Sequence, residues 1–196
     1  MDQPLPAHTF NEVRYYLMVT PCRSCGKGPW SVDDPPTVTR VHQEVTVQAR
    51  CQKCLTVQPF RFLCQSASAA ADPEAECINP TDSPSRLVDP AQWLSLFYLL
   101  VESAAAETSR SQTRLGGYRA ALCLAEALKF YGDDELPPES AFLTPVSATA
   151  FREHPEKFAR QRLRDMQSKL PSLPVMARRL TRDHRARRRW WQFWKT

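Results

Sequence analysis

Two pairs of cysteines are the residues of this chain best placed to do chemistry. Cys22 and Cys25 form one C-x2-C motif and Cys51 and Cys54 form a second, with 25 residues between the pairs. Each motif is short enough to turn both sulfurs toward one point, and zinc favours a tetrahedron of ligands with Zn–S near ~2.3 Å. We therefore predict one structural Zn2+ site. Four thiolates would fill its coordination shell and leave no position for a substrate water.

Two other uses of these thiols compete with zinc. A rubredoxin-like iron centre has similar ligands, and spacing alone does not separate the two metals. A redox C-x-x-C pair would lie at a strand-to-helix junction of a βαβ pattern, which neither motif matches. Of the remaining cysteines, Cys77 and Cys123 have no obvious partner, whereas Cys64 could either approach the metal or be a small buried thiol.

The other nucleophiles and bases of the chain form no catalytic signature. The four histidines are scattered along the sequence and match neither H-E-x-x-H nor a paired-ligand or nucleophile motif; they are His8, His42, His154 and His184. We expect them to be structural or surface residues. With only 5 glycines there are also few loops that could cradle a phosphate. The sequence therefore predicts a protein that is not an enzyme and has no small-molecule substrate.

The segments around the cysteines have the composition of short strands. Residues 15–20 lead into the first pair, 41–50 lead into the second, and 56–63 leave it. Val45 and Val47 alternate with polar residues, as Phe60 and Phe62 do, which is typical of half-buried strands. We expect a three-stranded sheet from these segments, and a loop over residues 26–39, where turn-forming residues cluster.

These features resemble the zinc-ribbon superfamily over residues 12–65, through Cys22-x2-Cys25-Gly26, Cys51-x2-Cys54 and the strand-rich flanks. Gly26 stands where such knuckles often use a glycine in a left-handed backbone conformation. Leu55 departs from that pattern at the matching position, so we expect a less regular second knuckle. The resemblance implies a fold that is stabilised by a structural zinc ion. Zinc ribbons variously contact nucleic acid, join proteins or only stabilise a small domain.

Composition divides the chain into four parts. We predict an α+β protein with a zinc ribbon at 1–64, a flexible linker at 65–88, a helical domain at 89–170 and a basic arm at 171–196. The linker is rich in Ala, Ser, Pro and Asp and has few large apolar residues.

The helical part is predicted to begin with an antiparallel hairpin. Asp89-Pro90-x-Gln92 has the side-chain cap, the early proline and the capping-box glutamine of a helix start, and the helix should run to about Thr108. A second helix is expected from after Ser111 to Gly132, whose Gly116-Gly117 pair would either fray its first turn or allow close packing. A third is expected from Pro155, with Leu163, Met166 and Leu170 on one face.

Positive charge gathers at the C-terminal end. Residues 1–80 have a net charge of −1, residues 81–145 of −4 and residues 146–196 of +10. The arm, expected to be a weakly amphipathic basic helix, contains the candidate partner-binding residues: Arg178, Arg182, Arg185, Arg187, Arg188, Arg189, Trp190, Trp191, Phe193 and Trp194.

Three partners suit this arm. Arginines and tryptophans together suit an anionic membrane interface, and they also suit RNA or single-stranded DNA. The third is a protein surface, including the chain's own acidic hairpin. We predict a non-enzymatic zinc-binding adaptor whose arm docks on an anionic membrane surface or a protein partner, with an RNA- or DNA-binding zinc-ribbon protein as the alternative.

The sequence also predicts a compartment. Its first residues lack the basic start and apolar run of a signal peptide, and seven cysteines are an odd number. The longest nearly apolar run, residues 93–101, is about half of the ~20 residues that span a membrane. We expect a cytoplasmic protein, with peripheral membrane association through the arm.

Overall fold

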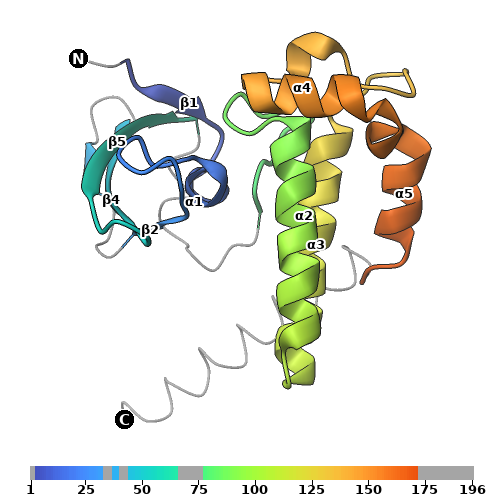
Figure 1. Cartoon of the computed structure of the whole chain (residues 1–196), viewed down its shortest axis with the longest axis horizontal. Coiled ribbons are helices and arrows are strands. Elements are labelled where there is room, and N and C mark those ends of the chain that lie inside the picture. Colours follow the sequence, from blue (N-terminus) through green and yellow to red (C-terminus); the bar gives the residue numbers. More distant parts are fainter. Residues whose placement is uncertain (1–2, 33–36, 40–43, 66–76, 172–196) are drawn as a thin grey trace, which may run out of the picture.

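The computed structural model describes residues 3–32, 37–39, 44–65 and 77–171, and it has an α+β fold with a small sheet beside a group of helices (Figure 1). The strands are β1 (Leu5–Ala7), β2 (Trp30–Val32), β3 (Thr37–Thr39), β4 (Glu44–Cys51) and β5 (Val57–Cys64). The helices are α1 (Phe10–Val19), α2 (Pro90–Ala106), α3 (Arg110–Leu128), α4 (Pro145–Glu153) and α5 (Arg160–Ser168), with short 3-10 turns η2 (Glu139–Ala141) and η3 (Pro155–Phe158).

Strand β4 is the centre of the sheet. One of its edges pairs antiparallel with β5 along most of its length, and the other pairs first with β3 and then with β2. Strand β1 adds a parallel edge to β5, so the sheet order is β1-β5-β4-β2, with β3 also on β4. The strands expected around residues 41–50 and 56–63 are present. The loop expected at 26–39 was wrong, because it contains β2 and β3.

The strand expected at residues 15–20 was also wrong, because these residues belong almost entirely to helix α1. Thr9 caps this helix by accepting a hydrogen bond from the Glu12 N–H at 3.2 Å. Val13 and Leu17 lie one helical turn apart and are 0% and 1% exposed. Thr9-x-x-Glu12 matches a capping-box signature, and this local signal outweighs the strand propensity of residues 15–19.

Helix α1 packs between the sheet and α2, so the N-terminal part and the helices share one hydrophobic core (Figure 1). The rings of Tyr15 on α1 and Trp93 on α2 lie 5.6 Å apart. Among the larger side chains of this core, Trp93, Phe62 and Val47 are each 0% exposed. The core therefore continues across the predicted boundary between the zinc ribbon and the helical domain.

Part of the predicted flexible linker belongs to the same core. Ile78 and Val88 are 1% and 0% exposed. The Asn11 side-chain amide donates to the Cys77 carbonyl at 3.2 Å, and the Thr9 hydroxyl donates to the Ile78 carbonyl. The linker expectation was therefore wrong for residues 77–88, because a few apolar side chains find partners on distant elements; residues 66–76 lie outside the described part of the chain.

The predicted hairpin is confirmed as α2 and α3. Asp89 accepts the Gln92 N–H at 2.9 Å and Gln92 accepts the Asp89 N–H at 3.0 Å, which completes the capping box. Helix α3 begins before Gly116, and a Cβ on Gly116 would lie 2.7 Å from Ala104 Cβ on α2. The glycine therefore allows close packing of the two helices.

The chain after the hairpin differs from the single third helix expected from Pro155. Helix α4 comes first, with Thr144 as its N-cap and Pro145 at its start, and it lies across the end of the hairpin where α2 begins (Figure 1). Pro155 opens only the short η3 turn, and α5 follows beside α3. Leu163 of α5 is buried at 1% exposure, as its expected apolar face requires.

Candidate metal centre

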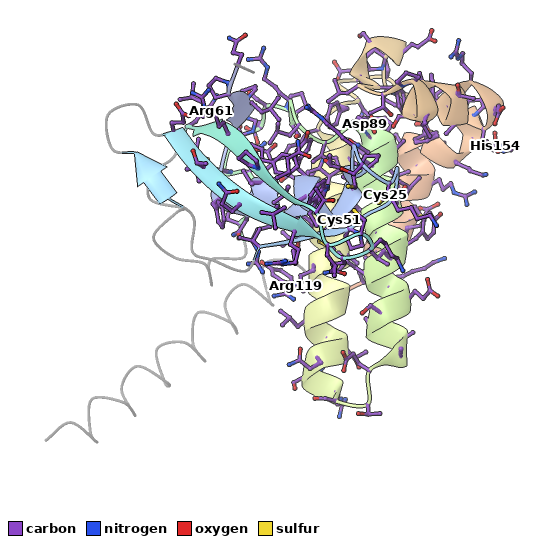
Figure 2. All side chains as sticks on the ribbon, turned by 60° about the vertical axis from the view of Figure 1, so that its left-hand side comes forward. Cys25, Cys51, Arg61, Asp89, Arg119 and His154 are labelled. Atoms are coloured by element: carbon purple, nitrogen blue, oxygen red, sulfur yellow. The ribbon has the colours of Figure 1, made fainter. Side chains whose placement is uncertain are left out.

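The four cysteines of the predicted metal site lie together at one end of the sheet. Cys22 and Cys25 are in the turn between α1 and β2, whereas Cys51 ends β4 and Cys54 lies in the turn before β5. Figure 2 shows Cys25 and Cys51 side by side, with Arg61 toward the opposite end of the sheet. Pairing of β2 with β4 places Trp30 opposite Cys51, so the strand register brings the two turns together.

The two turns have the same backbone conformation. The Gly26 N–H donates to the Cys22 carbonyl at 2.8 Å, and the Leu55 N–H donates to the Cys51 carbonyl at 2.9 Å. The next pair of hydrogen bonds also matches, from Cys22 N to Lys27 O and from Cys51 N to Thr56 O. Gly26 and Leu55 have φ angles of +68° and +62°. The expectation of a less regular second knuckle was therefore wrong, because Leu55 takes the left-handed conformation that glycine takes in the first.

The sulfur positions suit one tetrahedral ion. All four Sγ atoms lie within 4.8 Å of one another; Cys22 and Cys54 Sγ are 3.6 Å apart, and Cys25 and Cys51 Sγ are 3.8 Å apart. A tetrahedron with metal–sulfur bonds of ~2.3 Å has edges of about 3.8 Å. Cys22 and Cys51 are buried, whereas Cys54 is exposed. The four cysteines are thus placed to hold one metal ion, in a geometry that is compatible with zinc.

The thiols of the cluster have unequal pKa values. Hydrogen bonds with the hydroxyl and backbone of Thr56 lower the pKa of Cys54 to about 6. A hydrogen bond with the Lys27 backbone lowers the pKa of Cys25, but desolvation and the three neighbouring thiols outweigh it and raise that pKa to about 11. Without a metal ion, Cys54 is therefore the more acidic of these two thiols and Cys25 the less acidic. A divalent ion would displace the remaining protons and hold all four sulfurs as thiolates.

The surplus cysteines are separate from this cluster. Cys64 is 2% exposed at the end of β5 and is not one of the four grouped thiols, so the small buried thiol is confirmed. Burial, with the charge of Glu12, raises its pKa to about 11. Cys123 is buried in α3, and burial together with Glu126 raises its pKa strongly. Both thiols are held protonated, which suits packing more than reaction.

A buried polar cluster between α1 and α3 was missed by the sequence analysis. Glu12 is 0% exposed, and its carboxylate accepts a hydrogen bond from the backbone N–H of His8 at 2.6 Å. The same carboxylate lies 3.2 Å from Nδ1 of the His8 ring. Glu126 is 4% exposed; its Oε1 accepts Lys129 Nζ at 2.8 Å, while its Oε2 has no hydrogen-bond partner among the described residues. Lys129 also donates to the carbonyls of Asn79 and Thr81. This cluster holds the segment after residue 77 onto α3.

We expect Glu126 to make stability depend on pH. Burial raises the pKa of Glu126 to about 7, although Lys129 opposes the shift. A carboxyl whose pKa is raised on folding binds more protons in the folded state than in the unfolded state. The contribution of Glu126 to folding stability is therefore full below about pH 4.5 and is lost as pH rises through about 7. Glu126→Gln should therefore increase the free energy of unfolding at pH 8 by about 1–3 kcal/mol, and much less at pH 5.

Urea unfolding of both proteins across pH 5–8 measures that difference. The matched control is Glu139→Gln, because Glu139 is an exposed carboxyl near Arg152 at 3.8 Å. It should leave the pH profile unchanged. A constant difference between Glu126→Gln and the parent at every pH would contradict the prediction.

The two knuckle residues with positive φ allow a paired test. Leu55→Gly should stabilise the metal-loaded protein by about 0.5–1 kcal/mol, because relief of left-handed strain exceeds the extra entropy of an unfolded glycine. Gly26→Leu should destabilise it by about 1–2 kcal/mol. A Cβ at Gly26 would meet nothing within 4 Å, so the second change reports backbone strain alone. Thermal unfolding measures both changes in stability. Two variants that were both stabilised or both destabilised would contradict the prediction.

The predicted arm lies almost wholly outside the described part of the chain, which ends at Pro171. All ten candidate partner-binding residues, from Arg178 to Trp194, are beyond it. Pro171 itself packs on α3, where a Cβ on Gly117 would lie 3.2 Å from its Cδ. Among the described helices, none is both long and apolar enough to cross a bilayer.

Two of the four histidines are also beyond the described residues, namely His42 and His184. His8 is buried against Glu12, and His154 ends α4 with its Nδ1 3.4 Å from Glu156. Both therefore have structural contacts.

Comparison of the chain with protein-family models, with curated proteins and with solved structures found no match. The class of the protein follows from the fold and the site alone. It is an α+β protein in which two C-x2-C turns bring four thiols close enough to hold one metal ion, and in which helix α1 packs against the helical hairpin.

Proposed function

We propose that this chain is a non-enzymatic zinc-binding adaptor, in which a closed zinc site maintains the fold and the basic arm contacts a partner. The observation that supports it most directly is the grouping of four sulfurs within 4.8 Å, at spacings that suit a tetrahedral ion. Four thiolates complete the shell of zinc, and a complete shell stabilises a fold without offering a position to a substrate. The site is thus structural in this proposal.

Metal analysis tests the zinc part of the proposal. We expect one zinc per chain in the purified full-length protein, and release of that zinc when the thiols are titrated with a mercurial. Zinc is a d10 ion without visible colour, whereas a ferric four-thiolate centre would be coloured. A stoichiometry well below one, or visible absorption accompanied by one iron, would overturn it.

The arm is the part of the chain that we propose meets the partner. Residues 171–196 include eight basic side chains and one acidic residue, Asp183, and they end in a group of aromatic residues. Basic residues near an anionic bilayer each contribute about 1 kcal/mol, and tryptophans favour the headgroup region. A cytoplasmic location with peripheral membrane association is consistent with this proposal.

Truncation after Pro174 should weaken binding to vesicles that contain phosphatidylserine by at least about tenfold, because several such contributions are lost. Flotation or tryptophan fluorescence measures the binding at two salt concentrations, and intact protein should show a blue shift. The matched full-length control replaces Trp190, Trp191 and Trp194 with alanine and keeps every arginine.

Titration of the same proteins with single-stranded RNA distinguishes membrane binding from the alternative, which is nucleic-acid binding. Loss of RNA binding alone would favour the nucleic-acid function. Unchanged binding to vesicles and to RNA would remove the arm from the function.

A further inference from the structure

Leu55 combines two unfavourable features at the edge of the metal site. It is the only residue other than glycine with a positive φ among the described residues, and it is 64% exposed. The equivalent residue of the first knuckle is Gly26, which takes this conformation without strain. Packing among the described residues does not account for an exposed leucine in a conformation suited to glycine. Strain of this kind concentrates at sites where a side chain is needed for function.

The two segments that contain the knuckles have a net positive charge. The knuckle segments 20–32 and 50–58 contain the exposed cations Arg23, Lys27, Arg50 and Lys53 and no acidic residue. A divalent metal with four thiolates carries a formal charge of about −2, so two positive charges remain in excess. Val57, two residues beyond Leu55, is 49% exposed and adds a second aliphatic side chain. This end of the sheet is thus both basic and aliphatic.

The aromatic side chains nearby offer little exposed surface to a nucleic acid, because Trp30 and Phe62 are buried and Phe60 is partly buried. Trp30 is 4% exposed and lies against Phe60 with ring centroids 5.1 Å apart, and Phe60 stacks in turn on Phe62. Proteins that bind single strands need accessible aromatic faces for base stacking. The exposed apolar side chains at the knuckles are aliphatic, and these suit a polypeptide better than a base.

We propose that Leu55, Val57, Lys27 and Lys53 form a knuckle surface that binds an acidic polypeptide segment with aliphatic side chains. Lys27 and Lys53 attract the acidic residues, while Leu55 and Val57 cover apolar side chains of the partner. The proposal rests on the zinc site, since the metal holds the two knuckles at one place. It adds a second partner-binding surface to the proposed arm.

Selection of a displayed library of random short peptides on the zinc-loaded, full-length protein tests the proposal. We expect enrichment of peptides that combine Asp or Glu with Leu, Ile or Val. Their affinity, measured by fluorescence anisotropy, should fall roughly tenfold for Leu55→Gly, as loss of a buried leucine contact predicts. Lys53→Gln should also weaken binding and reduce its dependence on salt.

Val146→Ala is the matched control, because Val146 is an aliphatic residue with 79% exposure on α4. It should bind the selected peptides as the parent does. Three results would overturn the proposal. They are an equal peptide affinity for Leu55→Gly and the parent, no enrichment of acidic-aliphatic sequences, and competition by single-stranded RNA at the same site. Faster zinc loss from Leu55→Gly with unchanged peptide affinity would assign Leu55 to shielding the metal instead.

Zinc content measured on each preparation separates this proposal from the proposed function. A parent protein without zinc counts against the zinc-binding adaptor itself. A parent with one zinc whose peptide binding ignores Leu55 counts against the knuckle surface alone.

Discussion

Cys51→Ser is expected to abolish stoichiometric metal binding and to destabilise the whole protein, with the strands beside the metal site losing protection first. Cys51 is 0% exposed, ends β4, and has its sulfur 3.8 Å from that of Cys25. Structural zinc contributes about 10–16 kcal/mol of apparent binding energy in finger-sized peptides. That value is comparable to the whole stability of a typical domain, about 5–15 kcal/mol, so the remaining contacts should not hold β2, β4 and the knuckles in place.

Metal content, amide hydrogen exchange of β4 and β5, and thermal unfolding measure this effect. Cys77→Ser is the matched control, because Cys77 is an exposed cysteine outside the four grouped thiols. It should keep one metal per chain and the parent's unfolding temperature. Addition of a strong chelator to the parent should reproduce the loss of protection seen in Cys51→Ser. A Cys51→Ser protein that keeps its metal and its protected strands would contradict a structural role for the site.

Trp93→Ala should have the largest effect of a change away from the metal. Trp93 is 0% exposed and joins α2 to α1 through the ring of Tyr15 at 5.6 Å. Loss of a buried tryptophan typically costs about 3–5 kcal/mol, because the cavity is only partly refilled. Since the core is continuous between the sheet and the helices, we expect metal release and loss of helical signal in one transition at lower denaturant concentration.

The control for this prediction is Trp93→Phe. Its ring fills most of the space, and it removes the indole N–H, which has no hydrogen-bond partner among the described residues. Removal of an unpaired buried donor offsets part of the lost packing, so the cost should be well below that of alanine. If Trp93→Ala lowered the helical transition alone and left the metal-bound sheet intact, two separately folded domains would be the better description.

Local signals account for what the sequence predicted well. The C-x2-C spacing places two thiols in one turn, and the capping box at Asp89 and Gln92 lies within four residues, so neither depends on distant contacts. The helical hairpin follows from such a start and from long apolar periodicity. Two further helix starts have equally local signals, namely Thr9-x-x-Glu12 at α1 and Thr144-Pro145 at α4.

Other features required contacts between residues far apart in the chain. Residues 30–32 have too few positions to show a strand period, and they become β2 only because β4 offers a free edge. Ile78 and the pair Leu87–Val88 are the few large apolar residues of a polar segment, and they are buried because distant elements of the chain complete the core around them. Nothing in residues 1–30 or 110–130 indicates that Glu12 and Glu126 lie in one buried cluster.

The sequence by itself therefore determined the four candidate metal-binding cysteines, the α+β class and the two long helices, because each depends on chemistry or periodicity within a few residues. Tertiary structure alone decided that α1 is a helix packed between the sheet and α2, that residues 77–88 belong to the core, and that Glu126 is buried with a pKa raised to about 7. It also decided that Leu55 takes the conformation of Gly26, because closure of the second turn around the shared site requires it.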